Sequence, residues 1–170
     1  MKDNMSFATD NWEEFEKLSI SILETYLPAD SEISYSITHT PNRKDGGYDG
    51  LIIIASGNEN IDQCKILSES KLRELSNKDL PMSDFSKTLI IAINLMAQKI
   101  YIFTNLHYST ETQKRIHKFS SFSNIQVELV DIFEVSDRVK ELYKTLKDTY
   151  SPTFLKKLID SVSTHPASKR

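Results

Sequence analysis

Residues 45–72 read DGGYDGLIIIASGNENIDQCKILSESKL, a segment of two apolar runs joined by a polar turn. The loop 41–50 holds three of the chain's four glycines, which indicates a backbone that needs positive φ or approaches another group closely. The apolar run 51–55 predicts a buried strand, and GNEN at 57–60 predicts the turn of a hairpin. A second strand is predicted over 62–72, so the stretch is expected to form a β-hairpin.

The predicted hairpin carries acidic and basic side chains at one end. Side chains two residues apart in a strand share a face, so Glu69 and Lys71 are expected to point the same way. Asp49 begins the partner strand and can close a site from across the hairpin. The alternative is that Glu69 and Lys71 form an ordinary ion pair on an exposed strand face.

These residue types suit metal-dependent phosphodiester hydrolysis. Mg²⁺ prefers oxygen ligands, and the carboxylates of Asp49 and Glu69 with a backbone carbonyl, that of Ser70, leave room for water and phosphate. A lysine beside the metal, Lys71, can orient the attacking water or stabilise charge on the phosphate. The hairpin therefore predicts a phosphodiesterase site.

A helix is predicted over 11–27, because apolar residues recur there at the three-and-four spacing of a helix with one buried face. Glu16 lies about 20° from Leu23 and Leu27 on the helical wheel, inside the apolar arc. A carboxylate in that arc is costly unless it meets a partner. Two interpretations stay open: Glu16 is an edge residue or part of a buried ion pair, or it reaches the metal site.

The remaining elements alternate between strands and helices. Strands are predicted over 31–38, 99–104 and 125–130, and helices over 84–97, 110–119 and 135–150. This alternation predicts an α/β sandwich with a mixed sheet. The helix 84–97, with Ser83 as N-cap, is apolar on nearly every side, so we expect wide burial in the core or against another subunit. Residues 1–150 are expected to form the domain, and 151–170 a linker or C-terminal tail.

Composition restricts the classes of protein. A chain of 170 residues, 39% hydrophobic and 26% charged, fits one globular domain. The polar first dozen residues do not predict a signal peptide, and the apolar runs are too short to span a bilayer. The single cysteine, Cys64, excludes an intramolecular disulfide framework. A cytoplasmic location is the expectation.

Charge argues against tight DNA binding by one copy of the chain. The sequence has 21 basic and 24 acidic residues, a net charge of −3, whereas neutralised phosphates supply most of the affinity for DNA. Affinity is therefore expected to come from oligomerisation or an attached module. Arg43 and Lys44 beside the glycine-rich loop, and Lys87 on the helix 84–97, are candidate phosphate contacts, with plain solvated charges as the alternative.

The sequence resembles the Mrr-like restriction endonucleases of the PD-(D/E)XK nuclease superfamily over about residues 12–143. The resembling parts are Phe15-Glu16, Asp45-Gly46-Gly47-Tyr48-Asp49, Ser68-Glu69-Ser70-Lys71 and Ile102-Phe103-Thr104-Asn105. The resemblance implies a restriction-endonuclease-like α/β/α sandwich that cuts double-stranded DNA with Mg²⁺, for which Mn²⁺ can substitute. It also implies metal ligation by Asp49 and Glu69, catalysis by Lys71 and a contribution from Glu16.

The resemblance further implies the N-terminal effector domain of a bacterial restriction or antiphage defence protein, acting as a homo-oligomer or fused to a nucleotide-hydrolysing sensor. Two alternatives stay open. One is a catalytically inactive module of the same fold that binds nucleic acid or oligomerises, and the apolar helix 84–97 and the acidic balance favour it. The other is a junction-resolving nuclease, which usually needs a basic dimer surface.

Overall fold

The computed structural model describes residues 6–27, 33–39, 48–56, 64–74 and 79–164. These residues contain a five-stranded sheet in the order β1-β2-β3-β5-β7. Its strands are β1 (Ile33–His39), β2 (Gly50–Ser56), β3 (Cys64–Lys71), β5 (Lys99–Thr104) and β7 (Gln126–Val130). The pairs β1–β2 and β2–β3 are antiparallel, whereas β3–β5 and β5–β7 are parallel. The predicted mixed sheet is confirmed.

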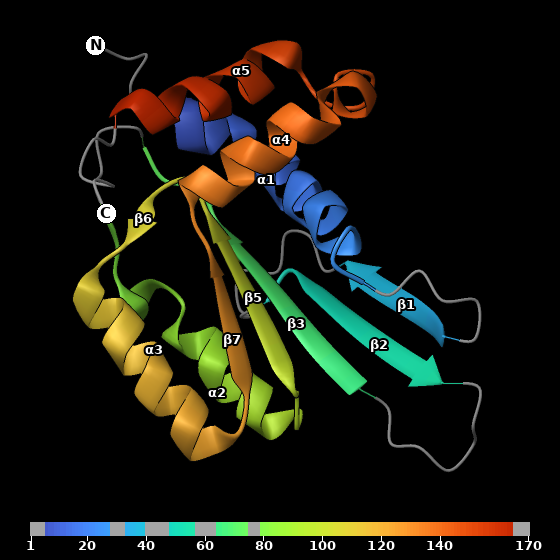
Figure 1. Cartoon of the computed structure of the whole chain (residues 1–170), viewed down its shortest axis with the longest axis vertical. Coiled ribbons are helices and arrows are strands. Elements are labelled where there is room, and N and C mark those ends of the chain that lie inside the picture. Colours follow the sequence, from blue (N-terminus) through green and yellow to red (C-terminus); the bar gives the residue numbers. More distant parts are fainter. Residues whose placement is uncertain (1–5, 28–32, 40–47, 57–63, 75–78, 165–170) are drawn as a thin grey trace.

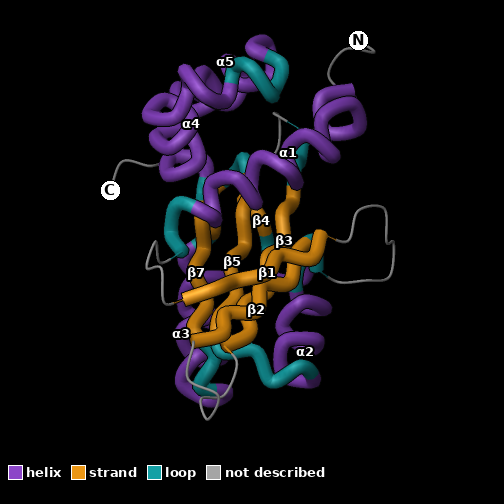
Figure 2. Tube along the Cα trace, turned by 90° about the vertical axis from the view of Figure 1, so that its right-hand side faces the viewer, coloured by secondary structure: helices purple, strands orange, loops and turns teal. Residues whose placement is uncertain are grey.

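Helices cover the sheet in two groups (Figure 1). The first group is α1 (Ser6–Glu24), α4 (Ile132–Leu146) and α5 (Pro152–Asp160), which is followed by the short η3 (Ser161–Thr164). The second group is α2 (Ser86–Asn94) and α3 (Thr110–Ser123). In the view turned by 90°, α2 and α3 flank the lower part of the strands, and α1, α4 and α5 lie at the upper end (Figure 2).

Strand alternation divides the core between the two helix groups. Tyr101 and Phe103 of β5 belong to the hydrophobic cluster of α1, α4 and α5. Ile100 and Ile102 of the same strand belong to the cluster of α2 and α3. Successive side chains of a strand point to opposite faces, so β5 is buried on both sides.

Most predicted elements are found with shifted ends. The predicted helix 11–27 begins earlier, at Ser6, and Phe7 packs against Phe154 with ring centroids 6.2 Å apart. The predicted strand 99–104 matches β5, whereas the predicted helices 110–119 and 135–150 become Thr110–Ser123 and Ile132–Leu146. The predicted turn 57–60 lies outside the described residues, but β2 and β3 pair in the antiparallel register that a hairpin requires.

Two expectations about the helix 84–97 were wrong. Ser83 is not its N-cap, because a 3₁₀ turn, η2 (Met82–Asp84), comes first and α2 starts after Phe85, with no side-chain cap. Wide burial in the core is also wrong, because α2 packs inward with one face only, through Thr88, Leu89 and Ala92. Ile90 and Ile93 are 60% and 52% exposed. Burial against another subunit stays a prediction.

The expected linker or tail from residue 151 was wrong for residues 152–164. Ser151 caps α5 by accepting a hydrogen bond from the Phe154 amide, and Phe154, Leu155 and Leu158 are buried in the cluster shared with α1 and α4. The sequence also did not predict a two-stranded sheet of β4 (Asp79–Leu80) and β6 (His107–Tyr108). Of the helices in the described ranges, none has the length and hydropathy needed to cross a membrane.

Candidate active site

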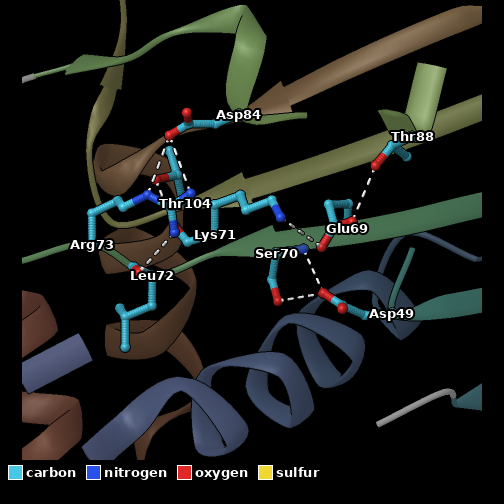
Figure 3. Close-up of polar contacts among 9 residues, drawn as sticks. All are labelled: Asp49, Glu69, Ser70, Lys71, Leu72, Arg73, Asp84, Thr88 and Thr104. Atoms are coloured by element: carbon cyan, nitrogen blue, oxygen red, sulfur yellow. Dashed lines mark hydrogen bonds and ion pairs between the residues drawn. The ribbon is translucent and has the colours of Figure 1, made fainter. Parts of the chain in front are cut away.

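Asp49 lies where β2 leaves its loop, and Ser70 of β3 holds it there. The Asp49 amide donates to the Ser68 carbonyl at 2.8 Å, which fixes the backbone beside β3. Asp49 Oδ2 accepts two hydrogen bonds from Ser70, from its amide at 2.6 Å and its hydroxyl at 2.7 Å (Figure 3). Asp49 is thus oriented by a residue of the neighbouring strand.

Glu69 is buried, with 5% of its surface exposed, and both of its carboxylate oxygens have partners. Oε1 lies 3.8 Å from the Lys71 ammonium, which confirms the predicted shared strand face. Oε2 accepts a hydrogen bond of 3.0 Å from the Thr88 hydroxyl on α2 (Figure 3). The ordinary surface pair considered as an alternative does not describe this buried arrangement.

A cavity of about 360 Å³ opens at this end of the hairpin; we call it the hairpin cavity. Its lining residues come from α1, β3, η2, α2 and the entry to β2, and they are Trp12, Glu16, Tyr48, Asp49, Glu69, Ser70, Lys71, Leu72, Arg73, Asp84, Lys87 and Thr88. The predicted convergence of Asp49, Glu69 and Lys71 on one cavity, with Glu16 facing it, is confirmed. Lys87 also lines the hairpin cavity, whereas Arg43 and Lys44 lie outside the described residues.

Burial and neighbouring carboxylates raise the pKa of two glutamates of the hairpin cavity, Glu16 and Glu69. Burial raises the pKa of Glu16 from 4.5 to about 8, helped by the charge of Asp49, a hydrogen bond with it, and the charge of Glu69. Burial and the charge of Asp49 likewise raise the pKa of Glu69 to about 8, although Lys71 and the Thr88 hydroxyl oppose the shift. Ionisation of Glu16 and Glu69 is therefore unfavourable, and both side chains keep a proton near neutral pH when no cation is bound.

This donor set fits a divalent cation. Within the described ranges no three His, Cys, Asp or Glu side chains are already grouped as a metal site. Two carboxylates and a carbonyl are nevertheless enough for Mg²⁺, which keeps several of its waters when it binds to proteins. A cation between Asp49 and Glu69 would also offset the repulsion that raises the pKa of Glu69.

Several residues of the hairpin cavity were not predicted from the sequence. Arg73 faces Asp84, with Nε at 3.2 Å and an Nη atom at 3.1 Å from the same carboxylate oxygen. Its backbone exchanges two hydrogen bonds of 2.8 Å with the buried Asn105 side chain. Spacing offered a signal for Arg73, since it follows Lys71 by two residues. Thr88 offered another, since its hydroxyl interrupts an apolar helix.

The fold is similar to that of a solved nuclease. The MspJI restriction endonuclease, in complex with a 27-mer oligonucleotide, superposes with a TM-score of 0.66 at 15% sequence identity. The match covers 91% of this chain and 33% of MspJI, so the chain spans about a third of that protein's length. The chain has a restriction-endonuclease-like fold. Neither a family model nor a curated protein matches the sequence.

Proposed function

We propose that this chain is a metal-dependent DNA endonuclease domain of the PD-(D/E)XK superfamily, of the Mrr-like subtype. One observation carries the proposal: Asp49, Glu69 and Lys71 meet in the hairpin cavity, and Glu16 joins them from α1. Two carboxylates beside an ammonium match the needs of phosphodiester hydrolysis with a bound cation. The restriction-endonuclease-like fold supports the same reaction class.

The proposal gives a role to five residues of the hairpin cavity. Asp49, Glu69 and the carbonyl of Ser70 would hold Mg²⁺, or Mn²⁺ in its place, which supplies an acidic water and charge stabilisation when bound. The Lys71 ammonium, 3.8 Å from Glu69, orients the attacking water or stabilises the phosphate charge. Glu16, next to Asp49, accepts a hydrogen bond from water on the α1 side of the cavity.

The proposed substrate is double-stranded DNA, held weakly by a single domain. Lys87 lines the hairpin cavity and is a candidate phosphate contact, as are Arg43 and Lys44. A net charge of −3 leaves little capacity to neutralise phosphates, so affinity would come from assembly as a homo-oligomer or fusion to a sensor module. The context that we propose is the N-terminal effector domain of a bacterial restriction or antiphage defence protein.

Cleavage of supercoiled plasmid tests the proposal. The wild-type protein is incubated with plasmid and MgCl₂ or EDTA, alongside Lys71→Met and Lys65→Met. Lys65 is the matched control, because it lies on the same strand and donates to the Leu95 carbonyl, away from the hairpin cavity. We expect Mg²⁺-dependent nicking by the wild type and Lys65→Met, and its loss in Lys71→Met. Cutting that persists in EDTA or in Lys71→Met would contradict the assignment.

A non-catalytic module is the second candidate. The exposed Ile90 and Ile93 on α2 favour it, because apolar residues on a helix surface commonly mark a contact with a partner. In that case a sensitive assay would find no cleavage with Mg²⁺ or Mn²⁺, while DNA binding or self-association would remain measurable.

A further inference from the structure

Thr88 is a fully buried polar residue in an apolar setting. It lies on the inner face of α2, with Leu89 and Ala92, and its exposed fraction is 0%. Its hydroxyl donates a hydrogen bond of 3.0 Å to Glu69 Oε2, across a sequence separation of 19 residues. The helix thus contributes a directional contact to β3 beyond its packing.

This contact determines how the Glu69 carboxylate is oriented. The Lys71 ammonium lies 3.8 Å from Oε1 and the Thr88 hydroxyl 3.0 Å from Oε2, so the two oxygens are held by partners from different elements (Figure 3). A glutamate side chain has several rotatable bonds, and fixing it costs conformational entropy. A hydrogen bond that fixes it before a ligand arrives removes that cost from binding.

The Asp49 carboxylate is also oriented by a hydroxyl group. Its Oδ2 accepts from the Ser70 amide and hydroxyl at 2.6 Å and 2.7 Å. Each of the two carboxylates therefore has one oxygen anchored by a hydroxyl, which leaves its other oxygen to face the remaining groups of the hairpin cavity. Outer partners of this kind commonly change metal affinity by about 10–100-fold when they are removed.

We propose that Thr88 is a positioning residue, which orients the Glu69 carboxylate from α2 for divalent-cation binding in the hairpin cavity. The inference rests on the proposed function and names a role that lies in a separate helix. The cation site would then depend on how α2 packs against the sheet.

Direct cation titration tests this inference without DNA. Trp12 is the only tryptophan and lines the hairpin cavity, so its fluorescence reports on MgCl₂ or MnCl₂ added alone. We expect Thr88→Val to raise the apparent Kd for the cation by about 10–100-fold. Thr88→Ser, which keeps the hydroxyl, should stay near the wild type.

Thr112→Val is the matched control. Thr112 is also a buried helical threonine with a hydroxyl hydrogen bond, from Ser109 at 2.9 Å, but it lies on α3 away from the hairpin cavity. Thr112→Val should lose stability without changing the cation Kd. If Thr88→Val does not give a cooperative melt, Thr88→Ala removes the same hydroxyl and replaces it with a strong helix former.

The cleavage assay separates the inference from the proposed function. We expect Thr88→Val to need about 10–100-fold more Mg²⁺ for half-maximal cutting, with a rate within severalfold of wild type at saturating Mg²⁺. Cation binding that is equal in the wild type and Thr88→Val would overturn the role of Thr88 and leave the nuclease proposal standing. A wild-type protein that binds neither cation would overturn both.

Discussion

The two helices beside the hairpin cavity differ in how they are held. α1 has its apolar stripe fully covered, with Leu18, Ile22 and Leu23 completely buried against β-strands, α4 and α5. α2 packs inward only through residues such as Leu89 and Ala92, while Ile90 and Ile93 are more than half exposed. Both helices contribute to the core, but α1 buries more apolar side chains in it than α2 does.

The two helices also bring opposite chemistry to the hairpin cavity. α1 contributes a carboxylate, Glu16, whereas α2 contributes the hydroxyl of Thr88 and the ammonium of Lys87. Burial disfavours the charged form of Glu16 and raises its pKa. A helix with few inward contacts can shift at lower cost. The α1 side of the hairpin cavity is therefore held by more buried side chains than the α2 side.

The largest expected effect is on the cleavage reaction and comes from a residue of β3. Glu69→Gln removes a proposed metal ligand but keeps the shape of the side chain. We expect cleavage to fall by more than the roughly 10–100-fold that is typical of an outer partner, with an unchanged melting temperature or a higher one. Plasmid cleavage and thermal melts are measured together. Retained cleavage would separate the hairpin cavity from the activity.

Because Phe154 is buried and Ile93 is exposed, truncating the two side chains should lower the free energy of unfolding by very different amounts. Phe154→Ala, on α5, removes a ring that is 2% exposed and packs against Phe7 of α1, and should cost about 3–5 kcal/mol. Ile93→Ala, on the exposed face of α2, should change stability by no more than about 0.5 kcal/mol. Urea unfolding of both variants gives the two values. A cost for Ile93→Ala close to that for Phe154→Ala would show that α2 is held as firmly as α1.

The acidic cluster predicts a pH dependence of the metal-free protein. The pKa values of Glu16 and Glu69 are raised to about 8, so the folded state keeps protons that the unfolded chain releases near 4.5. This contribution to stability is fully present below pH 4.5 and is lost as the pH rises through 8. In EDTA, the melting temperature should fall from pH 5 to pH 8.5 by about 2–4 °C for each kcal/mol lost.

Glu16→Gln serves as the control for that experiment. Of the two carboxyls with a raised pKa, it removes the one on α1. The melting temperature should therefore fall less steeply with pH than in the wild type. MgCl₂ added at pH 8 should raise the melting temperature of the wild type more than it does at pH 6, because cation and protons compete for Glu69. Parallel curves for Glu16→Gln and the wild type would mean that Glu16 does not titrate in this window.

The smallest expected effect concerns the Lys87 ammonium on α2. Lys87→Ala should weaken DNA binding modestly and lower the slope of log K against log salt by about one, as expected for one lost phosphate contact. Fluorescence anisotropy with a labelled duplex, in EDTA to prevent cutting, gives the slope. An unchanged slope would identify Lys87 as a solvated charge of the hairpin cavity rim.

Much of the candidate site could be predicted because its signals are local. Alternation along a strand places Glu69 and Lys71 on one face, and Asp49 begins the strand that pairs with theirs. The helical wheel turns Glu16 inward, since Leu23 and other residues of α1 are buried on that side. The alternation of strands and helices was likewise enough to predict a mixed sheet.

The sequence predicted the wrong structure where an element depends on contacts with segments distant in the chain. The segment after Ser151 is too short to stand as a helix alone, and it is stabilised because Phe154 and Leu155 meet a surface formed by α1 and α4. The strand pair β4–β6 joins two residues from each of two distant segments, a length at which periodicity has no meaning. Hydrophobicity over 84–97 predicted wide burial, but only one face of α2 packs inward, and Ile93 on the other face is exposed.

The side chains that share a face can be read from the sequence, because periods of 2 and 3.6 residues follow from backbone geometry. That was sufficient to group Glu69 with Lys71 and to turn Glu16 toward the core. The hydrogen bond from Thr88 to Glu69 and the ion pair of Arg73 with Asp84 could not be read from the sequence, since both depend on where the segment of η2 and α2 lies against β3. Periodicity sets the direction of a side chain within its own element, whereas the distance between elements is set by the packing of the whole core.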